Sequence, residues 1–214
     1  MKSSNMFTRP LRLIRLHWRR LLSELLVVFV GVYGAFMLNN YREKQHVQQQ
    51  RVNYLESFKE ELVNVEKLTD NLAIVSDTLL TRYKRAIANG ERPMLNVHLD
   101  LVYPINMLII RSAFNEQHFE AIGSEYVAKI SNGSNIISLL QERVEMFHDK
   151  SRDLLIYTGG DPDVLYDKNG TLKPAYQWYL QDLAYFKVVS RQLQQVIEKE
   201  AIPDIERLIQ QKEE

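Results

Sequence analysis

The histidines and carboxylates are the side chains of this sequence that could support acid–base or metal chemistry, and their spacing favours neither. The five histidines are scattered along the chain: His17, His46, His98, His118 and His148. No two of them form the i, i+4 pair with which a helix binds zinc. Four polar residues share one face of a predicted helix: Glu145, His148, Asp149 and Arg152. They could seat a metal, but a ladder of solvated charges explains the same spacing.

An acidic segment near the C-terminus raises the question of calcium. Its oxygen-bearing side chains are Asp161, Asp163, Asp167 and Asn169. They lack the alternating acids, the central glycine and the distal glutamate of an EF-hand loop. Aspartate, asparagine and glycine are also the residues that favour tight turns. We therefore predict a turn or small hairpin closed by Asn169 and Gly170, with an ion site as the alternative.

No other pattern in the sequence indicates catalysis. Glu116 and Glu120 lie one helical turn apart, but two carboxylates alone assign no acid–base role. The sequence contains no phosphate-binding glycine loop, nucleophile elbow or dinucleotide fingerprint. The absence of cysteine excludes thiolate catalysis and disulfides and fits an oxidising compartment. Aromatic residues enrich the last predicted helix and are more often core than ligand groove: Tyr176, Trp178, Tyr179, Tyr185 and Phe186. We expect no enzyme, no metal and no cofactor.

The longest apolar run, between Leu21 and Leu38, predicts a transmembrane helix over residues 21–41. Its 18 residues would span about 27 Å as a helix, enough for the hydrocarbon core of a bilayer. Trp18 and Tyr41 flank the run, where interfacial aromatic residues belong. A cleaved signal peptide is the alternative, but the exit AFMLNNYREK lacks a small-x-small cleavage pattern. We therefore expect an uncleaved anchor.

Basic residues precede this run and set its predicted orientation. Residues 1–20 contain no acid and six of the 27 basic residues, which are Lys2, Arg9, Arg12, Arg15, Arg19 and Arg20. Cationic flanks stay in the cytoplasm, so we predict a cytoplasmic N-terminus and an exterior domain after about residue 42. From Pro10 the arm should form an amphipathic helix in the headgroup layer, its arginines serving as topology charges or, alternatively, as a specific lipid site. The remaining 21 basic and 27 acidic residues give the body a charge of −6, which argues against nucleic acid as a partner.

Three small residues lie on one side of the predicted span: Gly31, Gly34 and Ala35. Small residues at such spacing let helix backbones approach closely within a membrane. Besides the lipid bilayer, we therefore expect a second copy of the chain or another membrane protein as a partner. The alternative is that glycine and alanine are simply common in spans. Glu24 lies one turn inside the apolar boundary, four residues after Arg20, and local pairing between the two accounts for its presence there.

The anchor resembles that of an uncharacterised bacterial family of single-pass inner-membrane proteins. The matching residues are Ser23-Glu24, Gly31, Ala35 and Asn39-Asn40-Tyr41-Arg42-Glu43. This chain departs from the family pattern at Ser23, where the family has glycine, and at Tyr41, where it has tryptophan. A weaker match covers Ser112-Ala113-Phe114, Gly123 and the helix that ends near Phe147. Together the matches cover about a third of the chain. The resemblance implies an inner-membrane anchor and a helical exterior domain, and it brings no activity.

The remainder of the sequence reads as helices joined by short breaks. No glycine or proline interrupts residues 41–89, where apolar residues recur every three or four positions from Leu55 to Ala86. Residues 94–110 alternate like a strand and predict either a short helix or an extended segment. Later helices are predicted at residues 112–122, 137–158, 179–197 and 204–212. Their boundaries are Gly123, a turn at Asn132-Gly133, Thr158-Gly159-Gly160 and Pro203.

These observations predict an all-α protein whose N-terminal transmembrane helix continues into a mainly antiparallel bundle. The expected parts are a cytoplasmic basic arm (1–20), the span (21–41), a polar helical stalk (42–54) and an extracytoplasmic bundle (55–214). The favoured function is a non-enzymatic interaction or scaffold module of the bacterial envelope. The alternatives are a small-ligand-sensing bundle that signals through the span to a partner, and, third, an enzyme. A deep pocket would favour the alternatives, and an exposed apolar patch would favour the first.

Overall fold

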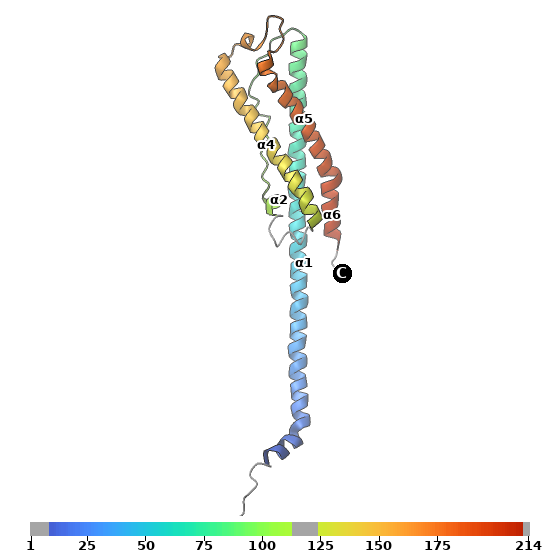
Figure 1. The fold of residues 1–214 in the computed structure, drawn as a ribbon. Coiled ribbons are helices and arrows are strands. Elements are labelled where there is room, and N and C mark those ends of the chain that lie inside the picture. The colour runs from blue at the N-terminus through green and yellow to red at the C-terminus, as the bar shows by residue number, and fades with distance from the viewer. Residues whose placement is uncertain (1–8, 113–123, 212–214) are drawn as a thin grey trace, which may run out of the picture. The chain divides into compact units, whose positions relative to one another are not determined.

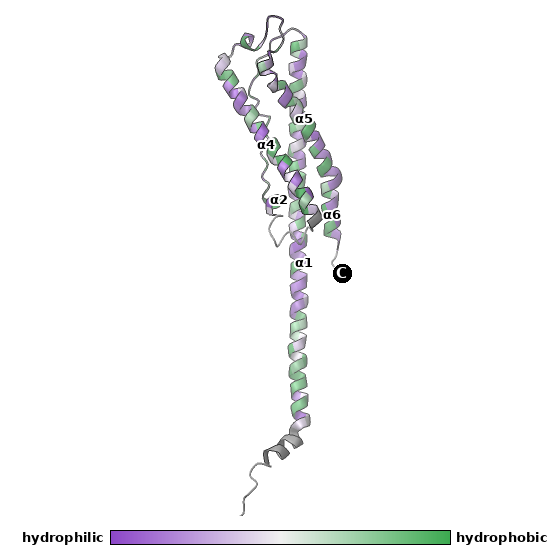
Figure 2. Cartoon of the chain, in the orientation of Figure 1, coloured by the Kyte–Doolittle hydropathy of each residue, from purple (hydrophilic) through white to green (hydrophobic). Residues whose placement is uncertain are grey.

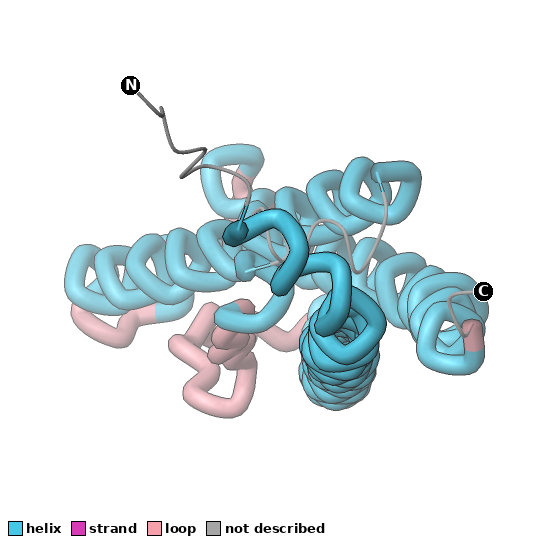
Figure 3. The backbone as a smooth tube through the Cα atoms, turned by 90° about the horizontal axis from the view of Figure 1, so that it is seen from below, coloured by secondary structure: helices cyan, strands magenta, loops and turns pink. Residues whose placement is uncertain are grey.

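The computed structural model describes residues 9–112 and 124–211. Their helices are α1 (Arg9–Ala88), α2 (Leu108–Ser112), α4 (Ser124–Thr158), η1 (Pro162–Leu165), η2 (Pro174–Tyr176), α5 (Trp178–Val196), η3 (Ile197–Ala201) and α6 (Ile202–Gln210). The described residues form no strand, as Figure 3 shows, and contain only an isolated bridge between Tyr166 and Leu172. The predicted all-α class is confirmed. The chain divides into two compact units, residues 1–50 and 51–214.

The first unit contains the apolar run, which lies inside α1 as predicted. Every residue from Arg20 to Val47 is exposed, because no other described segment packs on this part of the helix. Figure 2 shows that α1 is mostly hydrophobic over its apolar run and turns hydrophilic beyond it. Among the described residues, α1 is the one helix long and apolar enough to cross a membrane. The length and composition of α1 are therefore compatible with one membrane span.

The second unit is a bundle of α1 from Arg51 onward, α4, and the continuous run of α5, η3 and α6 (Figure 1). The predicted stripe on α1 is buried, with Leu55, Phe58, Leu62, Val65, Thr69, Leu72, Ser76, Leu79 and Tyr83 facing the core. The predicted stripe on α5 is buried too, from Tyr179 to Ile197. α5 runs antiparallel to α1 and α4, whereas α4 runs parallel to α1 (Figure 1).

An extended segment, residues 91–107, explains why α1 and α4 are parallel. It returns along the bundle without helix or strand structure, and α2 follows it. Alternate residues of the segment are buried: Leu101, Tyr103, Ile105 and Met107. The strand-like period in the sequence therefore reflects one buried side of an extended chain. Of the two predicted conformations, the extended one is confirmed.

Two predicted breaks behave differently from expectation. The turn at Asn132-Gly133 is wrong, because α4 runs through both residues; apolar packing on either side outweighs the poor helix propensity of this pair. The final short helix predicted at Pro203 is present as α6, with Pro203 in its first turn, but it follows the π-helical turn η3 directly and not after a break. The end at Thr158 is confirmed, and Gly159 takes the positive φ of 58° that a helix terminus favours. The helix predicted at residues 112–122 and its end at Gly123 fall outside the described residues, apart from Ser112.

Candidate functional site

A cluster of buried rings joins three parts of the bundle. The hydroxyl of Tyr83, on α1, lies 3.0 Å from Nε2 of His98 in the extended segment. The same hydroxyl lies 3.2 Å from the hydroxyl of Tyr179 on α5. The rings of the two tyrosines meet edge to face, with centroids 5.2 Å apart. The Tyr179 hydroxyl donates to the carbonyl oxygen of Asn96 at 2.6 Å. The cluster therefore combines apolar packing with hydrogen bonds across 96 residues of sequence.

Burial favours the uncharged forms of Tyr179 and His98. It raises the pKa of the Tyr179 hydroxyl far above its ordinary value, and the neighbouring Tyr83 raises it further. Burial, followed by the charge of Arg82, lowers the pKa of His98, although Asp100 acts in the opposite direction. A neutral imidazole beside protonated phenols can accept a hydrogen bond. The hydrogen bonds of Tyr83, His98 and Tyr179 in the structure run to one another and to backbone groups.

The cluster instead satisfies the backbone of the extended segment. The Tyr83 hydroxyl lies 3.1 Å from the Met94 carbonyl oxygen, and the Tyr166 hydroxyl donates to that of Pro93 at 2.7 Å. Tyr103, within the segment, lies 2.7 Å from Oγ1 of Thr69 on α1, and burial raises the pKa of Tyr103 to about 12. Buried backbone groups without a strand partner need such contacts. These tyrosines therefore fix the segment on the helices.

Charged residues join α4 and α5 at the surface of the bundle. Arg143 donates to Asp182 from Nε at 3.0 Å and from Nη2 at 2.7 Å. Its guanidinium also lies 3.9 Å from the ring centre of Tyr185. On the α1 side of α5, Lys187 lies 2.6 Å from Asp77, and its hydrogen bond lowers the pKa of that carboxyl. These pairs fix the contacts between helices.

The acidic residues near the C-terminus are used in turns. The Asp161 side chain accepts a hydrogen bond from the Asp163 backbone nitrogen at 2.9 Å. Oδ1 of Asp167 accepts from the backbone nitrogens of Asn169 and Thr171, both at 2.9 Å. In the part of the chain that the structure describes, no three metal-ligating residues cluster. The segment therefore forms the predicted turn, with η1 inside it.

The residues predicted to meet the membrane lie on the exposed part of α1. Trp18, Leu21, Leu38 and Tyr41 all have more than half of their surface exposed, as do the large apolar residues between them except Leu22, which is 43% exposed. A methyl group built on Gly31 or Gly34 would meet nothing within 4 Å, and Ala35 on the same helix is exposed. The Nε of Arg20 lies 3.2 Å from Glu24, so the predicted local pair forms. The side chains of Arg9, Arg12, Arg15 and Arg19 are outside the described residues.

An apolar cavity of about 310 Å³ opens between α4 and the η3 turn. Its floor comes from α1 and from buried residues of the facing helices, including Phe58, Leu62, Ile137, Leu193 and Ile205. Gly133 lies in its wall. This cavity is not predictable from local patterns, because the Asn132-Gly133 pair predicts a turn there and the π-helical turn has no clear sequence pattern.

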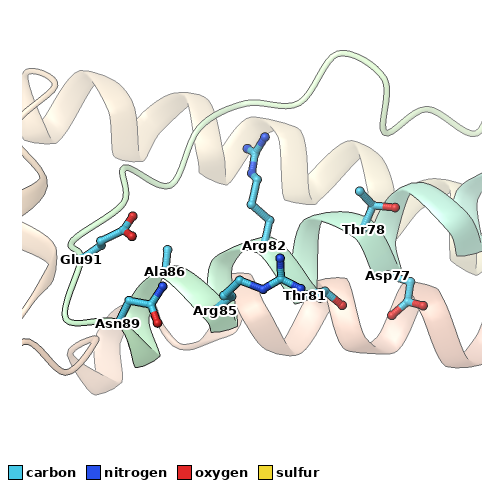
Figure 4. Close-up of a pocket in the computed structure, with 8 residues that line it drawn as sticks. All are labelled: Asp77, Thr78, Thr81, Arg82, Arg85, Ala86, Asn89 and Glu91. Carbon is cyan, nitrogen blue, oxygen red and sulfur yellow. The ribbon is translucent and has the colours of Figure 1, made fainter.

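A second hollow, along the end of α1, is polar. Figure 4 shows side chains along the last turns of α1 and beside the turn that follows. The lining residues are Asp77, Thr78, Thr81, Arg82, Arg85, Ala86, Asn89 and Glu91. They come from one helix and its terminal turn, and they include two acidic and two basic side chains. This hollow therefore has no second wall with which to enclose a ligand.

No protein-family model, curated protein or solved structure matches this chain. The resemblance of the anchor to a bacterial inner-membrane family therefore stays a prediction. The function has to be argued from the two regions of the chain: the exposed apolar part of α1 and the bundle with its cavity.

Proposed function

We propose that this protein is a membrane-anchored, non-enzymatic interaction module of the bacterial envelope. Residues 21–41 would cross the inner membrane, with the N-terminus in the cytoplasm and the bundle in the periplasm. The observation that supports this proposal most directly is the continuous exposure of the apolar residues from Leu21 to Leu38. A surface of this kind is stable in lipid or against another span and unstable in water. The preceding arginines give the orientation.

The bundle itself offers an exposed apolar surface on α4. Leu139, Met146 and Tyr157 are 60%, 52% and 73% exposed. Their separations of seven and eleven residues place them on the same side of the helix. By contrast, the buried carboxylate of Asp182 and the hydroxyl of Tyr179 form hydrogen bonds within the fold. A module that binds through α4 accounts for both observations better than an enzyme does.

Site-specific photo-crosslinking tests the interaction surface. A photoreactive amino acid at Leu139 or Met146, in cells that produce the full chain, should give a discrete crosslinked species. The matched control is the same amino acid at Arg152, which is also exposed but lies about 140° and about 120° around the α4 axis from Leu139 and Met146. A Leu139→Glu substitution should remove the species obtained from position 146. Equal crosslinking at position 152, or no species at all, contradicts the proposal.

An alkaline phosphatase fusion tests the proposed orientation. A fusion after Gly90 should be active because the enzyme folds only outside the cytoplasm, and a fusion after Arg20 should be inactive. The reverse pattern overturns the orientation.

The small-residue side of the span has its own test. Replacing Gly31 and Ala35 with isoleucine should weaken association in a membrane dimerisation assay, and unchanged association removes this part of the proposal.

The apolar cavity favours a second function, the sensing of a small ligand by the bundle. A ligand held between α4 and η3 would change the packing of helices that also contact α1. Since α1 continues from the bundle to the apolar run as one helix, such a change has a continuous element through which to act. The test is whether a cavity ligand changes the crosslinking from Leu139 in the experiment above.

A further inference from the structure

We infer that the cavity between α4 and η3 binds the single alkyl chain of an anionic amphiphile. The inference rests on the second function proposed above and names its ligand class. It is independent of the interaction surface on α4, because the cavity lies on the inward side of that helix. Three observations support it: a missing side chain, a π-helical turn, and a narrow apolar lining with charges at its mouth.

The first observation is that Gly133, which has no side chain, occupies a core-facing position of α4. Core positions of α4 recur at alternating spacings of three and four residues, through Ile130, Ile137, Leu140 and Val144. Gly133 occupies the position in this series between Ile130 and Ile137. A methyl group built on it would meet nothing within 4 Å. Glycine is unfavourable inside a helix relative to alanine, so the sequence retains a destabilising residue at the point where it leaves space.

The π-helical turn forms the opposite wall. η3 (Ile197–Ala201) lies directly between α5 and α6, and both of its terminal residues line the cavity. A π turn places one extra residue in the helix and displaces the side chains that follow, and such turns are frequent at functional sites. A glycine on one helix and a π turn on the facing helix thus open on the same space. Two unrelated packing defects at one place indicate a binding site.

The lining indicates the shape of the ligand. The α4 residues in the wall run from Tyr126 to Ile137, a length of about 16 Å at helical rise. A volume of 310 Å³ spread along that wall is narrow, so it suits an extended chain better than a fused ring system. Most lining side chains are apolar, and an apolar cavity binds apolar ligands in preference to water.

Lys129, the cationic side chain among lining residues that also include the acids Glu200 and Asp204, is the partner that we assign to an anionic headgroup. Nζ of Lys129 lies 3.5 Å from Asp204, a long contact, and the Lys129 side chain is 58% exposed. Asp204 also lies 3.2 Å from Nη2 of Arg207. Lys129 can therefore turn toward a ligand carboxylate or phosphate while Asp204 keeps a cationic partner. Glu200 is also in the lining, and its charge disfavours an anion placed on its side of the mouth.

Photoaffinity labelling of the full chain tests this inference. The protein is held in lipid nanodiscs and exposed to decanoic acid with a diazirine in mid-chain, and adducts are located by mass spectrometry. We expect adducts on cavity residues such as Ile137 and Val196. Unlabelled decanoic acid should compete strongly. Hexanoic acid should compete more than about a hundredfold less well, because each methylene contributes about fourfold in affinity.

Two leucine substitutions separate the cavity from its surroundings. Gly133→Leu fills the cavity and should reduce labelling at least about tenfold. Asn135→Leu adds the same side chain two residues away, at an exposed position of α4, and should leave labelling unchanged. If circular dichroism shows that Gly133→Leu does not fold, Gly133→Ala takes its place. Gly133→Ala adds one methyl group to open space and should still reduce labelling measurably.

The headgroup is tested by Lys129→Gln. This change should remove the preference for labelled decanoic acid over an equivalent labelled decanol, and adding a labelled decanoyl lysophospholipid distinguishes a lipid source from a free acid. Absence of cavity adducts, or equal labelling of wild type and Gly133→Leu, overturns the inference. Either result leaves the crosslinking from Leu139 unaffected, so failure here is distinguishable from failure of the interaction module.

Discussion

The two parts of α1 use apolar side chains in opposite ways. Between Leu21 and Leu38 the helix is apolar on every side, and these residues are exposed. From Leu55 the same helix carries apolar residues on one stripe, and that stripe is buried under α4 and α5. An all-round apolar helix needs an apolar solvent, whereas a striped helix needs partner helices. The difference therefore separates a candidate membrane span from a bundle helix within one element.

Paired substitutions of phenylalanine should give the largest difference between the two parts. Phe147 of the bundle is buried and its ring centre lies 4.8 Å from that of Tyr179. Phe147→Ala should lower the free energy of unfolding by about 3–5 kcal/mol, because it leaves a cavity in the core. Phe36→Ala, in the exposed run, should leave the unfolding of the bundle unchanged. Urea denaturation followed by tryptophan fluorescence measures both, and equal effects would contradict the comparison.

Paired substitutions of tyrosine test the hydrogen bonds of the ring cluster. Tyr83→Phe removes a hydroxyl that contacts His98 and the backbone of the extended segment. The loss should cost about 1–3 kcal/mol, since buried polar groups lose their partner. Tyr41→Phe removes a hydroxyl whose contact, with Gln45 at 2.8 Å, is exposed, and should cost little. The same urea denaturation measures both changes. An unchanged free energy of unfolding for Tyr83→Phe would show that the cluster does not fix the extended segment.

Of two paired glycine substitutions, only the one in the bundle should stabilise the bundle against unfolding. Gly133→Ala places a methyl group in the bundle cavity and improves helix propensity, so it should raise the free energy of unfolding by about 1 kcal/mol. Gly31→Ala, in the exposed run, should not change bundle unfolding. Thermal denaturation measures the shift. Destabilisation by Gly133→Ala would mean that the space beside Gly133 is filled in the folded protein.

Protonation of His98 should have the smallest effect. Burial and the charge of Arg82 lower its pKa in the folded bundle, so the unfolded chain takes up the proton first as the pH falls. The contribution of neutral His98 is therefore complete above its ordinary pKa of about 6.5 and decreases as the pH falls through that value. Wild type should lose stability relative to His98→Gln over this range. An NMR titration midpoint above 6.5 for His98 would contradict the assignment.

The parts of the fold predicted from the sequence are those that depend on local pattern. The stripe from Leu55 to Tyr83 and the end of α4 at Thr158 follow from helical periodicity and glycine. Gly133 was misjudged because an asparagine–glycine pair favours a turn locally, while the core packing of Ile130 and Ile137 keeps the helix intact. Tertiary packing overrides propensity at such positions.

The candidate sites depend on contacts that no local pattern encodes. Tyr83 and Tyr179 meet across 96 residues of sequence, and neither carries a motif. The cavity arises from Gly133 and η3, which come together only when α4 packs beside α5 and α6. The helix predicted at residues 179–197 includes Leu193 and Ile197, which lie in the core, but nothing in its sequence indicates the π turn that begins at Ile197.

Cysteine accessibility tests the central claim, that residues 21–41 lie in lipid and the bundle lies outside the cytoplasm. The chain has no cysteine, so each single substitution is the only reactive thiol. With a membrane-impermeant maleimide on intact cells whose outer membrane is permeabilised, Lys168→Cys should be labelled. Asn5→Cys should be labelled only after lysis, and Val28→Cys only after the membrane is dissolved and the protein denatured. Labelling of Val28→Cys or Asn5→Cys in intact cells, or protection of Lys168→Cys, would contradict the account.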